Sequence, residues 1–457
     1  MMKKTAIVFI LLAICLSLAF SFLNISSFES LMRPPKLSGE NRLLQQAFEK
    51  TVSNSDGIVM KNPLSGEYTS TYLFFDINND GQEEAFVFYS DLSEGNLACV
   101  SVFKNINNNW SFVSKIKCQS EEIYEVNFAD INGDETYEIL LSNKITEDMQ
   151  TVNITEYSTL GNKVLSVYSF GDASTTLLMT EMYSNLHIGD LNNDDADDLI
   201  LLNINLSDRE KKTISRILSY NEDYSVKQDK SVFLTGMLEV YNIITDTFVS
   251  EEIEHTRIYV DGAISERGVI TEVVDISHEN FEITLPLYEN NQSNQPVTLR
   301  DSKSLSMDFD GDNIIEIPTF SVFPYAEHIS KGTNERVPFN ITVWNELDGN
   351  NLFVDKKCVH NNSYRYFLII DDNWMERISL VYDSNNQTMT FYYVEQNGGF
   401  GKEIFSIRTF SSPEWSKNDS DYSQLADTSS YVYAVKFNDD EKTKYDDYIK
   451  QNFHVYN

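Results

Sequence analysis

One pattern of oxygen-bearing side chains occurs four times in this chain of 457 residues. The four nonapeptides are DINNDGQEE from Asp76, DINGDETYE from Asp130, DLNNDDADD from Asp190 and DFDGDNIIE from Asp308. Each has Asp or Asn at positions 1, 3 and 5 and an acid at position 9. Alternate side chains of a coiled loop point inward, and Ca²⁺ prefers about six to eight oxygen ligands at about 2.3–2.6 Å. The spacing therefore predicts four cation-binding loops. They are not EF-hands, because the closing acid is at position 9 and a strand follows.

The elements that must position these loops are short strands. Apolar, β-branched or aromatic runs flank each nonapeptide, such as YTSTYLFF before the first and AFVFY after it. The nonapeptides start 54, 60 and 118 residues apart, so a copy without the acids is expected in the last gap, around Asp261 in YVDGAISERGVITEVV. Each unit then holds about four strands, and radial repetition of four-stranded sheets is typical of β-propellers. We predict a mainly β fold with a propeller of about five four-stranded blades, six or seven being alternatives.

The acidic repeat resembles the FG-GAP or VCBS-type repeats of integrin-like β-propellers over about residues 66–360. This resemblance implies structural Ca²⁺ in up to four loops, held by side chains and by the carbonyl of position 7. The family's glycine after the third acid occurs only as Gly81, whereas Gly133 and Gly311 lie two positions earlier. The implied ligands are Asp76, Asn78, Asp80, Gln82 and Glu84; Asp130, Asn132, Asp134, Thr136 and Glu138; Asp190, Asn192, Asp194, Ala196 and Asp198; and Asp308, Asp310, Asp312, Ile314 and Glu316. The alternative is that the loops are solvated acidic turns without an ion.

The charge of the chain restricts its partners. It has 70 Asp and Glu against 35 Lys and Arg, a formal net charge of −35. Nucleic-acid binding requires clustered cations, so this composition argues against nucleic-acid partners and favours divalent cations and neutral or cationic ligands. Three cysteines outside the N-terminal apolar run are too few for a disulfide framework, and we expect buried thiols. Cys99 and Cys118 facing each other across a hairpin are the alternative.

The N-terminus predicts export. Residues 5–23, TAIVFILLAICLSLAFSFL, carry no charge and follow MMKK, which is typical of a signal peptide or a membrane anchor. AFS at 19–21 fits a cleavage site, while the length of the run favours a retained anchor. We expect a cell-membrane protein with an extracellular body, or a secreted protein if the segment is cleaved. Residues 24–60 are predicted to be a linker and a short helix with Leu43, Leu44, Ala47, Phe48 and Val52 on one face.

A separate α+β domain is predicted over 361–457, after a propeller spanning 61–360. Strands are expected around Trp374 and in YVYA at 431–434, and an amphipathic helix in EKTKYDDYIKQNF. This domain resembles one found in secreted clostridial proteins, and RPPKLSGENRLLQQAFEKTV near the N-terminus resembles the start of clostridial surface proteins. These resemblances imply a bacterial secreted or membrane-anchored surface protein without defining an activity.

The catalytic motifs that are readable from sequence are missing. The chain has no G-x-S-x-G, H-E-x-x-H, glycine-rich phosphate loop or C-x-x-C, and its six histidines are scattered. We therefore predict a membrane-tethered, calcium-stabilised propeller that binds a protein, peptide or glycan or has a structural role in the envelope. The alternative is an extracellular polysaccharide hydrolase or lyase, with acids converging at the centre of the propeller. A sensory module would need a separate output partner.

Overall fold

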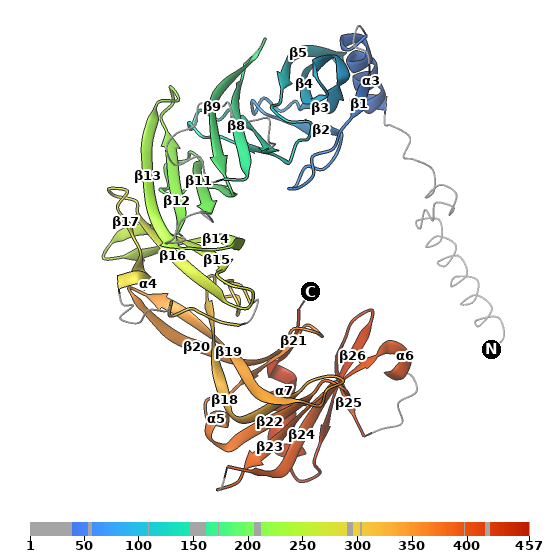
Figure 1. The fold of residues 1–457 in the computed structure, drawn as a ribbon, viewed down its shortest axis with the longest axis vertical. Coiled ribbons are helices and arrows are strands. Elements are labelled where there is room, and N and C mark those ends of the chain that lie inside the picture. Colours follow the sequence, from blue (N-terminus) through green and yellow to red (C-terminus); the bar gives the residue numbers. More distant parts are fainter. Residues whose placement is uncertain are drawn as a thin grey trace, which may run out of the picture. The chain divides into compact units, whose positions relative to one another are not determined.

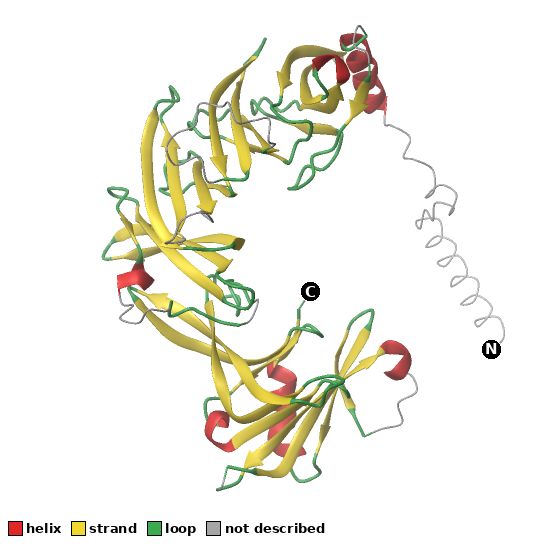
Figure 2. Ribbon diagram, in the orientation of Figure 1, coloured by secondary structure: helices red, strands yellow, loops and turns green. Residues whose placement is uncertain are grey.

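The computed structural model describes residues 39–456 except 54–56, 108, 146–160, 172, 205–211, 290–295, 302–303, 397 and 416–420. The expected export segment at 1–23 and the linker up to residue 38 lie outside the described residues. Within the described ranges, no helix has the length and apolar character needed to cross a bilayer. Strands dominate, as Figure 2 shows, which confirms the prediction of a mainly β protein.

The chain divides into two compact units, residues 1–127 with 169–176 and residues 128–168 with 177–457, which are described separately. The first unit contains helix α3 and the first sheet, labelled in Figure 1. Its elements are α3 Gly39–Thr51, β1 Ile58–Met60, β2 Tyr72–Phe75, β3 Glu84–Asp91, a 3₁₀ turn η1 Leu92–Glu94, β4 Leu97–Ile106 and β5 Asn109–Lys117. β1 and β2 both pair with β3, so one edge of this sheet consists of two short strands.

The predicted amphipathic helix α3 covers one face of the first sheet. Leu44 and Phe48 are buried in a cluster with Val87 and Tyr89 of β3. Phe48 and Tyr89 meet edge to face with their ring centroids 5.0 Å apart. Leu43, expected on the same face, is 40% exposed. Burial of these two large apolar side chains contributes about 1.5–3 kcal/mol each to holding the helix on the sheet.

Three four-stranded antiparallel sheets follow, each with its strands in chain order. They are β6 Glu125–Ala129, β7 Glu138–Lys144, β8 Lys163–Phe170 and β9 Thr175–Tyr183; β10 Asn185–Gly189, β11 Asp198–Ile204, β12 Lys212–Tyr220 and β13 Val226–Thr235; and β14 Glu239–Ser250, β15 Ile253–Ala263, β16 Val269–Ser277 and β17 Ile283–Thr284. The short helix α4, Pro286–Glu289, follows β17. The strands β3, β7, β11 and β15 are buried along almost their whole length. Burial on both faces explains the continuous apolar runs of β3, β7 and β11, which are AFVFY, ILL and LILL.

The expected fourth copy of the acidic loop has a different structure. In its sheet, the turn between the first two strands is only Glu251 and Glu252, with φ of 50° and 70°. Two left-handed residues form the type I′ turn that closes a tight hairpin. The segment around Asp261 that sequence similarity suggested belongs instead to the next hairpin, β15–β16. Both hairpins, β14–β15 and β15–β16, have a strand–turn–strand pattern of apolar residues. The sequence alone therefore did not show which of the two corresponds to the acidic loops.

A ten-stranded sheet completes the second unit and crosses the boundary expected at residue 360. Its order is β25-β26-β24-β23-β22-β18-β19-β20-β21-β27. The strands are β18 Ile317–Ile329, β19 Arg336–Asp348, β20 Asn351–Asn361, β21 Tyr366–Ile370, β22 Ile378–Asp383, β23 Thr388–Val394, β24 Phe400–Ser411, β25 Ser423–Asp427, β26 Tyr431–Phe437 and β27 Phe453–Val455, with helices α5 Trp374–Arg377, α6 Ser412–Trp415 and α7 Lys442–Asn452. The expected boundary falls within β20, and β18 joins the later strands through a parallel pairing with β22.

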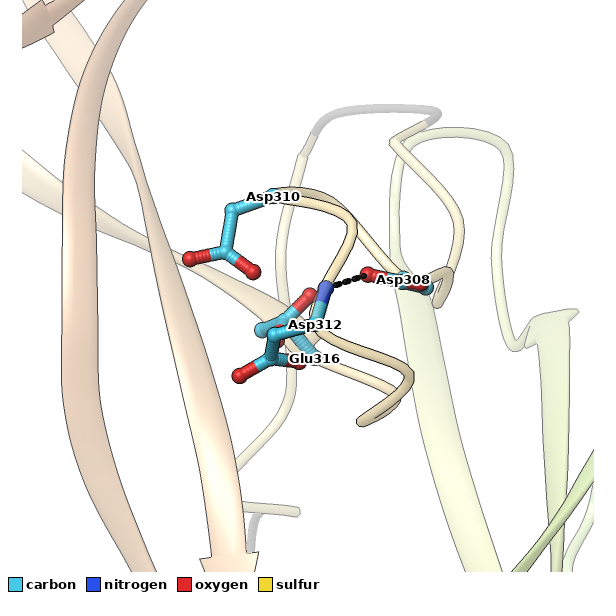
Figure 3. Close-up of side chains that lie close together, drawn as sticks. All are labelled: Asp308, Asp310, Asp312 and Glu316. Carbon is cyan, nitrogen blue, oxygen red and sulfur yellow. Dashed lines mark hydrogen bonds between the residues drawn. The ribbon is translucent and has the colours of Figure 1, made fainter.

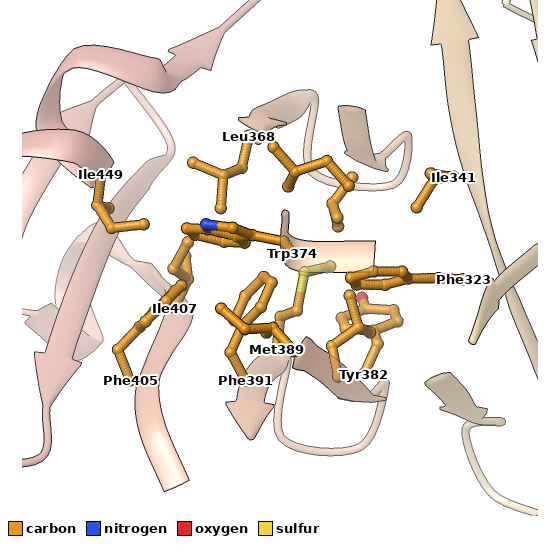
Figure 4. Packing of buried hydrophobic residues seen from close by; sticks show 14 of the residues in the cluster. Phe323, Ile341, Leu368, Trp374, Tyr382, Met389, Phe391, Phe405, Ile407 and Ile449 are labelled. Carbon is orange, nitrogen blue, oxygen red and sulfur yellow. The ribbon is translucent and has the colours of Figure 1, made fainter. Parts of the chain in front are cut away.

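One hydrophobic core unites this sheet with α7. Phe323 of β18 and Ile341 of β19 lie in the same cluster as Trp374, Phe391 and Ile449. Figure 4 shows Trp374 among side chains from several strands, with Phe391 nearby. The helix predicted in EKTKYDDYIKQNF is present as α7, and its Tyr445 and Ile449 are buried as its periodicity indicated. Residues on both sides of position 360 therefore stabilise one body.

Candidate metal centres

The four nonapeptides, called loops 1 to 4 (residues 76–84, 130–138, 190–198 and 308–316), lie in equivalent places. In loops 1 to 3 the closing acid is the first residue of a buried strand, β3, β7 or β11. Glu84 pairs with Phe75 before loop 1, and Asp198 with Gly189 before loop 3. Glu316 pairs with Met307 in an isolated bridge directly before β18. Pairing across the base of each loop fixes its two ends.

The position-1 aspartate organises the backbone of every loop. Its carboxylate accepts the backbone N–H groups of positions 5 and 6 at 2.8–3.2 Å in all four loops. The position-5 carboxylate accepts the N–H of position 7 at 2.8–3.2 Å. These hydrogen bonds coil the backbone around the acids, as alternate inward-pointing ligands require.

Positions 4 and 6 of each loop are left-handed, which explains the displaced glycines. Their φ values lie between 53° and 85° at Asn79 and Gly81, Gly133 and Glu135, Asn193 and Asp195, and Gly311 and Asn313. Glycine adopts this region without strain, and Asn or Asp tolerates it better than most residues. A glycine at either position therefore suits the same loop, and the shift in loops 2 and 4 leaves the backbone path unchanged.

Position 2 links each loop to the core and to its closing acid. Ile77, Ile131 and Leu191 are buried, and Phe309 stacks on Trp344 with ring centroids 4.4 Å apart. In all four loops the N–H of position 2 donates to one carboxylate oxygen of the closing acid, at 2.6–3.3 Å. The closing acid is therefore held in place from the buried side of the loop.

The second oxygen of the closing acid is buried without a protein partner in three loops. Among the described residues, Glu84 Oε1, Asp198 Oδ1 and Glu316 Oε1 accept no hydrogen bond. The corresponding oxygen of Glu138 accepts the hydroxyl of Tyr224 at 2.8 Å. A buried carboxylate oxygen without a partner is strongly unfavourable, and a bound cation would satisfy it.

Burial, with a smaller contribution from the aspartates of the same loop, raises the pKa of all four closing acids to about 7. In loops 2 and 3 the position-3 amides, Asn132 and Asn192, also have a buried side-chain oxygen without a partner. Among the described residues, loop 2 thus has one predicted ligand with an unpartnered buried oxygen, Asn132, and loop 3 has two, Asn192 and Asp198.

Loop 4 brings its carboxylates closest together. One oxygen from each of Asp308, Asp310, Asp312 and Glu316 lies within 4.8 Å of the others. Figure 3 shows Asp312 beside Glu316, Asp310 across the loop, and the amide of Asp312 donating to Asp308. Such oxygen-only groups suit a hard divalent cation. The acidic cluster is thus able to hold a metal ion.

Protein groups from outside the nonapeptides reach three of the loops. Tyr224 contacts loop 2 as described, Lys227 pairs with Asp194 of loop 3, and Lys356 Nζ lies 3.1 Å from Asp310 of loop 4. Two further acids, Glu346 and Asp355, bring a carboxylate oxygen within 4.8 Å of Glu316. None of these five residues was predicted from the sequence, because each lies about 30 or more positions beyond the end of its loop and in an ordinary strand or turn pattern.

The raised pKa values predict a pH effect on the metal-free protein. The closing acids have a pKa of about 7 in the folded chain and about 4.3 or less when unfolded, so the folded state binds more protons between these values. By linkage, the free energy of unfolding in EDTA falls as pH rises from about 4.5 to 7 and levels off above 7. Urea denaturation at several pH values measures this. A Glu84→Gln, Asp198→Asn, Glu316→Gln chain, whose groups do not titrate, should have a shallower slope.

Comparisons with known proteins show no family. No protein-family model and no curated protein matches the chain. An exo-β-1,3-galactanase from Phanerochaete chrysosporium shares 10% identity at a TM-score of 0.27, over 84% of this chain and 90% of that one. A GH43 β-1,3-galactosidase shares 10% at 0.26, over 87% and 98%. The Dos1 propeller shares 8% at 0.21, over 65% and 78%. Likenesses at these TM-scores carry no argument about blade number or activity.

Proposed function

We propose that this protein is an extracytoplasmic β-propeller-type binding protein whose repeat loops hold structural Ca²⁺. One observation carries the proposal: loops 1, 3 and 4 each bury a closing acid with an unpartnered oxygen beside two or more further carboxylates. A carboxylate group built in this way repels itself, and a divalent cation removes both the repulsion and the unsatisfied oxygen. The resemblance to FG-GAP or VCBS-type repeats and the four-stranded antiparallel sheets support the same proposal.

Ca²⁺ suits the loops better than Mg²⁺. The four side chains and one carbonyl of each loop come from a nine-residue turn with irregular geometry. Ca²⁺ tolerates irregular shells of about six to eight oxygens, whereas Mg²⁺ requires a near-ideal octahedron and retains several waters. Lys227 and Lys356 already neutralise part of loops 3 and 4.

Calcium should raise the melting temperature of full-length protein stripped with EDTA. For sites of about 10⁻⁴–10⁻³ M, 10 mM Ca²⁺ adds about 1.4–2.7 kcal/mol of stability per occupied loop. Differential scanning calorimetry with bound-metal analysis measures this. Asp76→Asn combined with Asp80→Asn should remove part of the shift. Asp372→Asn, a matched change in an 81% exposed side chain, should leave it intact. No shift at millimolar Ca²⁺ would defeat the proposal.

We also propose where the protein acts and which kind of partner it binds. We infer that residues 1–23 anchor the body outside the membrane, or release it after cleavage, and that the body recognises a protein, peptide or glycan. The support is the uncharged run at 5–23 and the acidic composition, which disfavours anionic polymers. Fractionation of the producing cell, with protease accessibility of the body, tests the location. A body protected inside intact cells would contradict it.

Hydrolysis of a polysaccharide is the competing function. Glycoside cleavage needs two carboxylates about 5–9.5 Å apart on either side of a sugar-binding cleft. In the described part of the chain, the carboxylates within 4.8 Å of one another lie in loop 4 and against it, a separation that suits a shared cation and is shorter than a glycosidase pair requires. Incubation of the purified protein with β-1,3-galactan and other plant and microbial glycans decides between the two functions. Release of reducing ends that survives EDTA would favour the hydrolase.

A further inference from the structure

Loop 4 differs from the other loops in its surroundings, because strands β19 and β20 carry acids beside it. Their pairing is irregular: Trp344 pairs with Lys356 while the next residue, Asn345, pairs with Val354. Asp355 is therefore the extra residue of a β-bulge. A bulge redirects side chains and lets two consecutive residues face the same side of a sheet. Because of the bulge, the side chains of Asp355 and Lys356 both face loop 4, and Lys356 forms an ion pair with Asp310.

Three acids from three segments meet at this place. Carboxylate oxygens of Glu316, Glu346 and Asp355 lie within 4.8 Å of one another. Glu316 is 0% exposed, and its Oε1 has no protein partner among the described residues. The buried Oδ2 of Asp355 also has none, although Oδ1 of the same carboxylate pairs with Lys356 at 2.6 Å. Two buried oxygens without partners thus belong to one acidic group.

The charges of this region exceed what one divalent cation neutralises. The two groups together contain six carboxylates, four in loop 4 and two on β19 and β20, and they share Glu316. Lys356 contributes one positive charge through contacts with Asp310 and Asp355. With one divalent cation in loop 4, three formal negative charges remain over the two groups.

We propose that loop 4 is half of a two-cation centre in which Glu316 bridges the nonapeptide cation to a second divalent cation held by Glu346 and Asp355. The inference rests on the proposed binding of a cation by loop 4. The second cation would connect the loop to β19 and β20, so that its binding stabilises the ten-stranded sheet as well as the turn. In loop 2 the equivalent oxygen of the closing acid already binds Tyr224, so no such position is open there.

Metal counting on the full chain tests this inference. Equilibrium dialysis against Ca²⁺, read by elemental analysis, should show one cation fewer in Glu346→Gln and in Asp355→Asn than in the unaltered protein. Glu316→Gln should lose two, because it removes the shared ligand. The control is Asp348→Asn, an exposed acid in the β19–β20 turn, which should lose none. Thermal melting of each variant without metal shows whether it is folded.

A second readout separates a shared ligand from a general effect of charge. Mn²⁺ in place of Ca²⁺ should give a spin-coupled pair in the electron paramagnetic resonance spectrum, absent in Glu346→Gln. If the unaltered protein binds calcium while Glu346→Gln and Asp355→Asn keep the same count, the second position does not exist and the calcium-stabilised loops stand. If the unaltered protein binds no calcium, the proposed function falls and the two-cation centre falls with it.

Discussion

Replacing Arg300 with methionine should destabilise the folded chain by about 3–5 kcal/mol. Arg300 and Asp261 form an ion pair of 2.8 Å in which both side chains are 0% exposed. The other oxygen of Asp261 accepts the backbone N–H of Ser306 at 2.8 Å. Removal of the guanidinium leaves a buried carboxylate without a counter-charge, held only by neutral donors such as the hydroxyls of Thr271 and Ser306. Urea denaturation monitored by fluorescence measures the loss as a lower midpoint.

A second arginine provides the control for this substitution. Arg336 pairs with Glu327 at 2.6 Å, but its side chain is 60% exposed. Surface ion pairs contribute about 0–1 kcal/mol, so Arg336→Met should change the midpoint little. The combined change Asp261→Leu with Arg300→Met removes both charges and should recover part of the stability that Arg300→Met loses. If Arg300→Met and Arg336→Met lowered the unfolding midpoint equally, the buried ion pair would contribute no more to stability than the exposed one.

Replacing Phe323 with alanine should also reduce stability strongly, by about 3–5 kcal/mol. Phe323 of β18 is 0% exposed and lies in the cluster that includes Leu368 and Trp374. If 361–457 folded as a separate domain, a change in β18 would leave its core intact. We expect instead that Phe323→Ala lowers the unfolding midpoint of that core, measured by the near-ultraviolet circular dichroism of its buried aromatic side chains.

Phe320, on the same strand, is the matched control because it is 40% exposed. Phe320→Ala deletes the same atoms from a position that water already reaches, so its effect should be below about 1 kcal/mol. A near-ultraviolet signal that is insensitive to Phe323→Ala would restore a boundary near residue 360. A signal that shifts with both variants would point to the strand as a whole and not to its buried side.

The sequence was informative where structure depends on local spacing. Short apolar runs beside each nonapeptide predicted strands, and the i, i+3, i+4 periodicity around Tyr445 predicted α7. The buried thiols Cys99, Cys118 and Cys358 agree with the expectation drawn from their number. For the strands and for α7 the deciding residues lie within about ten positions of one another, and alternation or helical periodicity alone sets which side is buried.

The features that could not be predicted depend on contacts between distant segments. Strands β18–β20 have the same alternation as propeller strands, and only the pairing of β18 with β22 assigns them to the ten-stranded sheet. The bulge at Asp355 is a matter of register between β19 and β20, which one sequence does not reveal. Tyr224 reaches Glu138 across 86 positions of the chain. The sequence therefore predicted the acids of the loops, but not the residues from distant segments that contact them.

The paired left-handed residues of each loop have a consequence for how such repeats diverge. Because positions 4 and 6 both have positive φ, glycine relieves strain at either place, and the chain has used both. Over evolutionary time, one substitution at each of these positions can therefore move the glycine from one to the other. The residues at the ligand positions do not need to change. Descendant repeats will be recognised best by their acid spacing together with glycine or asparagine at position 4, which all four loops share.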